Sequence, residues 1–293
     1  MTGRWAEVVA LVLLAWVVAV PLTHWYAHAL WVTLEPVAAL VVWQAIGLAG
    51  GFALLTAELT IAASGDGGRW RDAVRETLAD PLSAGVAGVA GLALVCLTTL
   101  WLLGVLAVPF VAAARSRRAH RAVLELLSEP AHEHGLSFDV IDAAPRTAYS
   151  LPGRTSHVVL SSSARACLGD GELRVVLAHE RAHLRQRHSL LVQPFVAWQR
   201  SVPLLHAPTV ARQRVEALVE MACDDAACRG ARRAEEVTLL RSALERLDPA
   251  GATTAERLDR LGAYRRSGGV AAGLLAVALL IAVAPPALLV LAG

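Results

Sequence analysis

Residues 169–188 read GDGELRVVLAHERAHLRQRH, and the order of polar and apolar residues in this stretch predicts an amphipathic helix. Asp170 is a favourable N-cap, and Glu172 in the first turn suits the positive end of the helix dipole. One stripe of the helix is apolar and is expected to be buried: Leu173, Leu177 and Leu184. The stretch is therefore interpreted as a helix with one face in a protein core.

The same helix carries histidines at a metal-binding spacing. His179 and His183 are four residues apart, so their imidazole rings stand one above the other on one face. Such a pair can bind one zinc ion, and Glu180 beside them can act as a general base. Arg181 departs from the strict form of this motif, which prefers uncharged residues between the histidines. It lies about 200° around the helix from His179, at ~100° per residue, and is expected to face solvent.

A zinc ion that hydrolyses peptides needs a third protein ligand and an open position for water. Residues 214–230, RVEALVEMACDDAACRG, place Glu216, Glu220 and Asp224 on one face of a second helix. Glu220 can bind the metal while Asp224 hydrogen-bonds a ligand histidine. A solvated acidic face is the alternative, but the apolar residues around these acids indicate that part of the face is covered.

The chain as a whole is unusually apolar. Of its 293 residues, 56% are hydrophobic and 18% are charged, whereas soluble domains are about 25% charged. Four segments approach or exceed the ~20 residues that cross a bilayer: residues 8–22, 36–57, 84–114 and 269–291. A cleavable signal peptide is the competing interpretation of the first segment, but a clear cleavage site is missing, so a retained helix is favoured. The sequence predicts a multi-pass protein of the cell membrane, in contact with the lipid bilayer.

Charged residues concentrate between the third and fourth segments. This stretch carries 23 of the 27 basic residues, all of them arginine, and is long enough for its own core. The chain is therefore divided into a membrane domain with three transmembrane helices (1–114), a polar domain (115–268) and a fourth transmembrane helix (269–293). Seven arginines flank the polar domain and four lie at the opposite ends of the spans. This bias places the polar domain in the cytoplasm.

Three motifs together resemble a known family. LAHERAH (177–183), EMACDDAA (220–227) and LPGRTSHVVLSSS (151–163) are similar to those of the BlaR/MecR-type membrane zinc metallopeptidases. These are antirepressor peptidases, gluzincins related to the HtpX/Ste24-like peptidases. Their layout of three spans, a cytoplasmic peptidase domain and a fourth span matches this chain. The resemblance implies an α-helical membrane protein with an inserted, mainly α, α+β zincin-type metallopeptidase domain.

The resemblance also assigns roles to individual residues. It makes His179, His183 and Glu220 the ligands of a catalytic Zn²⁺, Glu180 the base that activates the attacking water, and Asp224 an acid that holds a ligand histidine. It implies a zinc metalloendopeptidase that acts on a protein or peptide, for which a transcriptional repressor is the family-based expectation. The C-terminal penicillin-binding sensor domain of the beta-lactam receptors is expected to be lacking, because the sequence has no lysine for its acylation site.

Two alternatives remain open. One is a non-catalytic membrane receptor or scaffold with a structural zinc site, and the other is a quality-control protease of membrane proteins. Direct binding of nucleic acid is not expected. The oligomeric state, the physiological substrate and the activating signal do not follow from the sequence.

The remaining cysteines, histidines and apolar segments have simpler interpretations. The four cysteines are predicted to be reduced and buried, because none forms a C-x-x-C pair. His188 is interpreted as a surface residue. His206, which follows SVPLL, is a candidate to approach the zinc and stabilise an oxyanion, although no residue is assigned that role. Residues 157–161 are expected to form a strand that pairs with an extended substrate. Residues 190–205 form either a connection in the core or a segment that touches the membrane.

Overall fold

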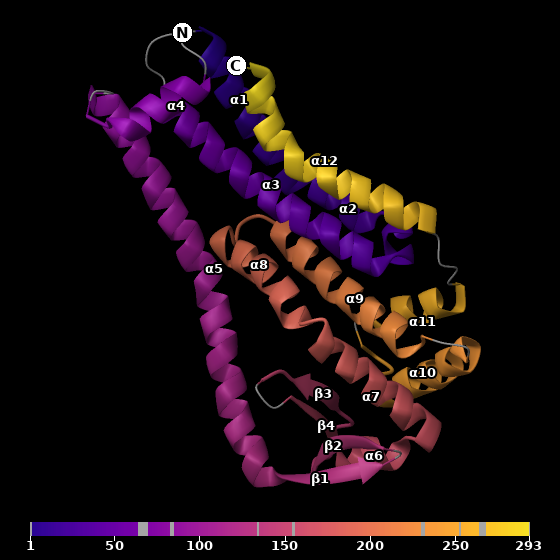
Figure 1. Cartoon of the computed structure of the whole chain (residues 1–293). Coiled ribbons are helices and arrows are strands. Elements are labelled where there is room, and N and C mark those ends of the chain that lie inside the picture. Colours follow the sequence, from indigo (N-terminus) through magenta and orange to yellow (C-terminus); the bar gives the residue numbers. More distant parts are fainter. Residues whose placement is uncertain are drawn as a thin grey trace.

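The structure, a computed structural model, describes residues 2–63, 70–82, 85–133, 135–153, 156–229, 232–251, 253–263 and 268–292. The chain is mostly helical with one small mixed sheet (Figure 1). Four helical stretches are long and apolar enough to cross a membrane: Trp5–His28, Pro36–Ala62, Gly88–Leu127 and Gly268–Pro285. The predicted fold class, a helical membrane protein with an inserted α+β domain, is confirmed.

The first of these stretches is not one regular helix. It consists, in order, of α1 (Thr2–Val17), the π-helical turn η1 (Val18–Leu22) and α2 (Thr23–His28). Pro21 lies inside η1, and because proline has no N–H, a carbonyl of the preceding turn loses its helical donor. Such a loss is a known cause of local irregularity in helices. The helical segment is therefore longer than the predicted residues 8–22.

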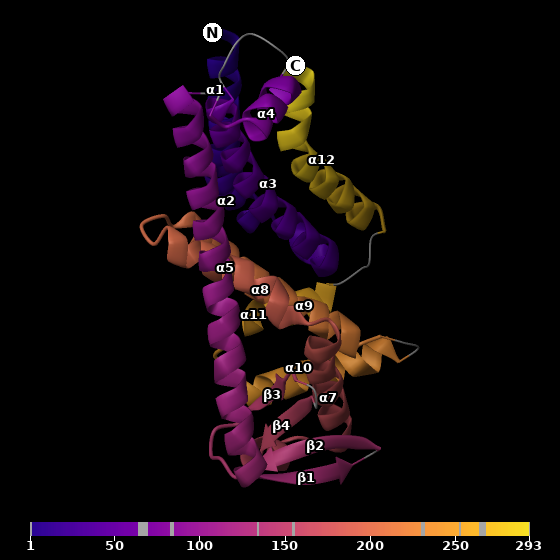
Figure 2. The ribbon, with the colours of Figure 1, turned by 60° about the vertical axis from the view of Figure 1, so that its left-hand side comes forward.

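The membrane bundle is built around α3 (Pro36–Ala62), which follows the short helix η2 (Leu30–Leu34) and precedes α4 (Trp70–Ala79). α1, α5 (Gly85–Leu127) and α12 (Gly268–Ala292) all pack against α3 (Figures 1 and 2). Gly91 permits the close approach of α5, because a Cβ there would lie only 2.6 Å from Ala62 Cα. A small residue at this contact is typical of helix pairs inside membranes.

Helix α5 continues without a break from the bundle to the sheet (Figure 2). The predicted domain boundary at residue 114 therefore falls inside one continuous helix. Near the far end of α5, Leu124 is buried against Leu151 and Val159, and Arg121 donates a hydrogen bond of 2.9 Å to the Pro152 carbonyl. The helix thus ties the membrane bundle to the sheet.

The sheet has the strand order β1-β2-β4-β3. Its strands are β1 (Ser128–Glu133), β2 (Leu136–Ile141), β3 (Ala148–Leu151) and β4 (His157–Ser161). The strand predicted at residues 157–161 is present, but it lies between β2, which is parallel to it, and β3, which is antiparallel. Its expected pairing with a substrate is therefore wrong, because both of its edges are used. The edge strand on that side is β3.

Six helices complete the polar part of the chain: α6 (Ser162–Cys167), α7 (Asp170–Arg185), α8 (His188–Ser201), α9 (Ala207–Ala227), α10 (Arg233–Leu247) and α11 (Thr254–Ala263). α8 and α9 form a hairpin that packs onto α3 (Figure 1). One apolar cluster contains Phe195 and Leu218 of the hairpin together with Trp43 and Ile46 of α3. The hairpin therefore shares a core with the membrane bundle.

The only strongly polar residue of the second predicted span has a structural partner. Gln44 donates a hydrogen bond of 3.1 Å to the carbonyl of Leu191 in α8. A polar side chain inside a span is expected to find such a partner, because lipid offers none. Gln44 thereby fixes α8 against α3.

Candidate metal centre

Helix α7 follows the sequence prediction closely. Leu173 and Leu177 are completely buried beneath the sheet, and Leu184 packs partly against the same cluster. The helix begins one residue earlier than expected, because Gly169, and not Asp170, is the N-cap and Asp170 is the first helical residue. Glu172 nevertheless has a role in the first turn, where its Oε2 accepts a hydrogen bond of 2.8 Å from the Gly169 N–H.

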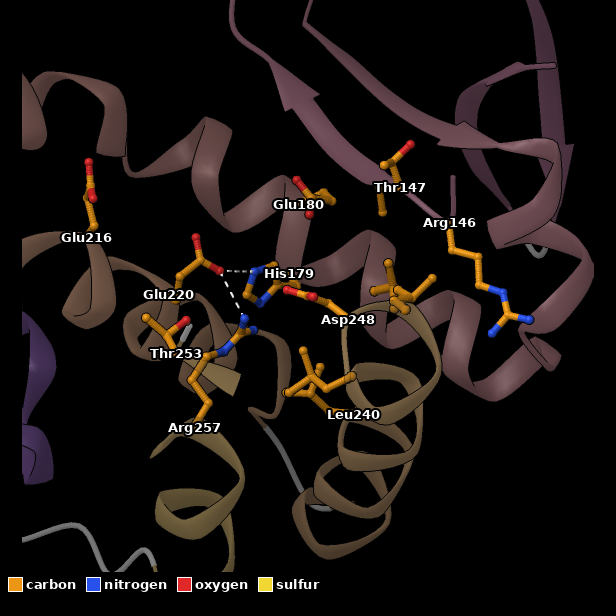
Figure 3. A pocket seen from close by; sticks show the side chains of 14 residues that line it. Arg146, Thr147, His179, Glu180, Glu216, Glu220, Leu240, Asp248, Thr253 and Arg257 are labelled. Carbon is orange, nitrogen blue, oxygen red and sulfur yellow. Dashed lines mark hydrogen bonds and ion pairs between the residues drawn. The ribbon is translucent and has the colours of Figure 1, made fainter. Parts of the chain in front are cut away.

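The structure brings His179, His183 and Glu220 together. The Nε2 atoms of the two histidines lie 3.2 Å apart, His179 Nε2 lies 3.2 Å from Glu220 Oε2, and His183 Nε2 lies 3.4 Å from Glu220 Oε1 (the contact of Glu220 with His179 is drawn in Figure 3). A tetrahedral zinc ion with bonds of about 2.0–2.1 Å holds its ligand atoms about 3.3 Å apart. The donor atoms therefore have the spacing that one zinc ion requires.

Asp224 and Arg257 hold the ligand side chains in place. Asp224 Oδ1 lies 3.0 Å from His179 Nδ1, although the ring N–H is not aligned well enough for a good hydrogen bond. Arg257 of α11 donates hydrogen bonds of 2.9 and 2.6 Å to the two oxygens of Asp224, and its Nη1 lies 3.3 Å from Glu220 Oε2. Asp224 and Arg257 thus hold both a ligand histidine and the third ligand.

The electrostatics of the metal-free site follow from these contacts. Burial alone would lower the pKa of His179, but Asp224 and Glu220 outweigh it and raise this pKa to about 9. Burial would raise the pKa of Glu220, yet hydrogen bonding to both histidines holds it far below its usual range. The pKa of Asp224 is likewise lowered: burial opposes this, and the Arg257 guanidinium overcomes it. Both acids are therefore carboxylates, and a proton occupies a position that a metal ion can take.

His188 is not the surface residue that the sequence predicts. It is only 2% exposed, and its Nδ1 lies 3.4 Å from His183 Nδ1 and 3.2 Å from Cys223 Sγ. Its Nε2 contacts Gln186 Oε1 at 2.8 Å. Burial, followed by the charge on His183, lowers the pKa of His188 to about 4, so this ring is neutral. His188 orients His183 in the way that residues behind metal-ligating histidines commonly do.

Cys223 offers a second possible set of metal ligands. Its Sγ and one nitrogen each of His179 and His183 all lie within 4.8 Å of one another. Burial raises the pKa of this thiol, followed by the nearby negative charge of Glu220, whereas binding a metal requires the thiolate. Glu220 is already ionised and sits at the better distance, so it fits a zinc ion better than Cys223 does.

The other cysteines fit the prediction in part. All four are free. Cys223 and Cys228 are buried as expected, whereas Cys167 is half-buried and Cys96 is exposed on the apolar helix α5.

Two buried arginines of α11 were not found from the sequence. Arg257 and Arg260 are 8% and 7% exposed, and each pairs with an acid of α9. Arg260 donates to both oxygens of Asp225, at 3.1 and 2.6 Å, and to the carbonyl of Thr33 at 2.6 Å. Arg260 thus connects Asp225 of the site helix α9 to the segment between the first two spans. The only sequence signal is that these arginines lie three residues apart in an amphipathic helix, which does not reveal their partners.

Two cavities border the site. The larger, about 640 Å³, is lined by His179, Glu180 and Glu220, by the start of the edge strand at Thr147 and Ala148, and by apolar residues of α7 and α10. Figure 3 shows Glu180 beside His179, on the side of the cavity toward Thr147. The smaller cavity, about 300 Å³, lies on the side of α8 and is lined by His183, His188 and Glu220, and by Ser150 and Pro152 at the other end of β3.

His206 does not join this site. It is exposed and forms the N-cap of α9. Glu220 lies on the same helix fourteen positions later, which corresponds to about 21 Å along the helix axis. The structure therefore gives His206 no role in stabilising an oxyanion at the metal.

Comparison with known protein families finds a match over part of the chain. Residues 113–229 match the model of peptidase family M48. The matched segment contains His179, Glu180, His183, Glu220 and Asp224, whereas α10 and α11 lie beyond it. No curated protein and no solved structure matches the chain. The match supports a membrane-type zinc metallopeptidase; the narrower resemblance to the BlaR/MecR type is untested and stays a prediction.

Proposed function

We propose that this chain is a multi-pass membrane zinc metallopeptidase that hydrolyses peptide bonds in a protein substrate. The observation that carries the proposal is the triangle of His179, His183 and Glu220 with edges of 3.2–3.4 Å. Glu180 lines the adjoining cavity, which leaves one side of the triangle open. An open position is characteristic of hydrolytic zinc sites, whereas structural sites are closed by four protein ligands. The M48 match over the same residues supports a peptide bond as the target.

Each step of the proposed hydrolysis is assigned to a named side chain. His179, His183 and Glu220 hold the metal, and Zn²⁺, when bound, polarises the scissile carbonyl and acidifies the attacking water. Glu180 accepts the proton from this water and delivers it to the leaving amine. Asp224 and His188 keep the two ligand histidines in orientation.

The substrate binds as an extended strand along the free edge of β3. Residues at the start of β3 line the larger cavity and residues at its end line the smaller one, while Glu220 lines both. A peptide paired with this edge therefore passes the metal with side chains in both cavities. In the larger cavity, Val176, Leu240 and Leu244 favour an apolar side chain.

The biological role is proposed from the family resemblance and the arginine distribution. The peptidase domain faces the cytoplasm, as the positive-inside tendency indicates. A transcriptional repressor is the substrate class that the BlaR/MecR resemblance favours. Comparing the proteins that accumulate in cells with wild type and with Glu180→Gln tests this. Accumulation of one DNA-binding protein supports the repressor, whereas accumulation of many membrane proteins supports quality control instead.

A structural zinc site is the second candidate, and the position of Cys223 favours it. If its thiolate bound the metal as a fourth ligand, the site would be closed and non-catalytic. Two matched variants separate the candidates. In the peptidase, Glu180→Gln keeps zinc and fold but slows cleavage by about 10²–10⁴, and Cys223→Ala keeps both zinc and cleavage. In a structural site, Cys223→Ala loses zinc, while Glu180→Gln changes nothing in the cell.

A further inference from the structure

The tip of the α8–α9 hairpin presents apolar side chains that nothing in the described part of the chain covers. Leu204 is 99% exposed and Leu205 is 46% exposed, and Pro203 beside them is also exposed. A single exposed leucine needs no explanation in a protein. Consecutive apolar residues at the end of a projecting hairpin are different, because they expose a continuous apolar surface that packs against no other described part of the fold.

The tip is held in position. Gln199 of α8 donates a hydrogen bond of 3.1 Å to Thr209 of α9, and Arg212 donates one of 2.9 Å back to Gln199 Oε1. Within the turn, the Leu205 N–H donates to the Val202 carbonyl at 3.0 Å. The leucines are therefore presented by a braced turn.

The hairpin lies at the level of the membrane spans. Phe195 of α8 packs edge-on against Trp43 of α3 with ring centroids 6.0 Å apart, and Leu191 accepts the hydrogen bond of Gln44. Trp43 is seven residues inside α3, which places this contact about 11 Å beyond the start of that span at Pro36. In Figures 1 and 2, the end of the hairpin lies beside the middle of α5.

The neighbouring surface of α5 is itself apolar and uncovered. Leu97, Leu100 and Leu103 are 65%, 66% and 57% exposed, as expected of a helix that faces lipid. On the hairpin, exposed Arg200 and half-buried Trp198 precede the tip. Arginine and tryptophan next to apolar residues are typical of the boundary between headgroups and acyl chains.

We propose that the tip of the α8–α9 hairpin, Val202–Leu205, inserts into the lipid bilayer beside α5, with Arg200 at the headgroups. Lipid is the occupant because the apolar tip is continuous with the lipid-facing side of α5 and lies level with the spans. The contact anchors the helix that carries Glu220, so the candidate metal centre is held at a fixed distance from the membrane. This inference does not depend on catalysis.

A spin label placed at the tip tests the proposal. The full chain with Cys96→Ser and Cys167→Ser retains two cysteines that are buried, so a label attaches at Leu204→Cys. The protein is reconstituted in vesicles of phosphatidylcholine and phosphatidylglycerol. Collision of the label with oxygen, which concentrates in lipid, is compared with collision with chromium oxalate, which stays in water.

Two matched positions calibrate the result. Leu97→Cys on the exposed face of α5 gives the lipid value, and Arg174→Cys on the exposed face of α7 gives the water value. The proposal expects Leu204→Cys to match Leu97→Cys, with high oxygen and low chromium oxalate collision. Agreement with Arg174→Cys overturns it. Protection from both reagents also overturns it, because a protein partner or a second copy would then cover the tip. The measurement requires no proteolysis, so failure of the proposed function would leave its outcome unaffected.

Discussion

The buried ion pair behind the metal centre makes the sharpest prediction about stability. Asp224 is completely buried, and Arg257 donates two hydrogen bonds to it while only 8% exposed. Asp224→Ala removes one partner and leaves the guanidinium buried. Such a change costs about 3–5 kcal/mol. Because Arg257 keeps its 3.3 Å contact with Glu220, we expect the lower end of this range.

The change can be followed as a shift in unfolding temperature. For a domain of about 150–250 residues, each kcal/mol lowers Tm by about 2–4 °C, so about 3 kcal/mol corresponds to roughly 6–12 °C. Tryptophan fluorescence of the detergent-solubilised, metal-stripped protein reports unfolding without a contribution from zinc affinity. The control is Glu216→Ala, which removes an ion pair whose side chains are 41% and 39% exposed, while Arg212 keeps its hydrogen bond to Gln199. That change is expected to cost about 0.5 kcal/mol or less.

A double variant shows whether the two residues act as a pair. Asp224→Ala with Arg257→Met removes both charges, so the loss should be smaller than the sum of the single losses by about 1–3 kcal/mol. The reasoning is refuted if Asp224→Ala destabilises no more than Glu216→Ala. It is also refuted if the losses of the two single variants simply add.

Three further predictions follow from the site and its attachment to the membrane bundle. Because His179 has a pKa of about 9 without metal, zinc affinity should rise about tenfold per pH unit up to that pH, as one proton leaves on binding; a flat profile in competition with a chelator would contradict this. His188→Ala should weaken zinc binding about 10–100-fold, since His183 loses its orienting partner; unchanged affinity in the same titration would remove His188 from the site. Gln44→Leu leaves the Leu191 carbonyl without its donor and should cost about 0.6–1.7 kcal/mol, with faster hydrogen exchange along α8; unaltered exchange there would show that this hydrogen bond does not hold α8.

The same protonation affects the stability of the metal-free protein. A raised pKa means that protonated His179 stabilises the fold fully below its ordinary value of 6.5. This contribution is lost as the pH rises through about 9. Stability of the stripped protein should therefore fall over this range, and bound zinc should remove the dependence.

Helical periodicity accounts for what could be predicted of the site. His179 and His183 lie on one regular helix, and Glu220 and Asp224 lie on another, so a period of 3.6 residues fixes which side chains share a face. The acids of α9 are surrounded by apolar residues, which predicts that their face is covered. The structure places all four side chains together at 3.0–3.4 Å.

Periodicity stops being informative where a helix ends. A regular helix that continued past His183 would point His188 away from the site, but α7 ends at Arg185. Arg187 then adopts a left-handed conformation with φ of 49°, and the chain turns into α8. This turn brings the His188 ring back against His183, which no count along a straight helix can show.

Contacts between elements far apart in the sequence could not be predicted where no shared metal ion links the residues. Arg257 reaches Asp224 across 33 positions of the chain, and Arg260 reaches Thr33 across 227. The position of β3 at the sheet edge also depends on strand order, because β4 inserts between β2 and β3. A single sequence contains the residues for such contacts but not their pairing.

X-ray absorption at the zinc edge of the purified full chain, together with metal quantitation, tests the central claim most directly. The account predicts one zinc ion per chain, bound only by nitrogen and oxygen at about 2.0–2.2 Å, with the same spectrum in Cys223→Ala and a loss of zinc in Glu220→Ala. A sulfur ligand at about 2.3 Å would identify Cys223 as a ligand and a closed, structural site. Absence of stoichiometric zinc would contradict the metallopeptidase itself.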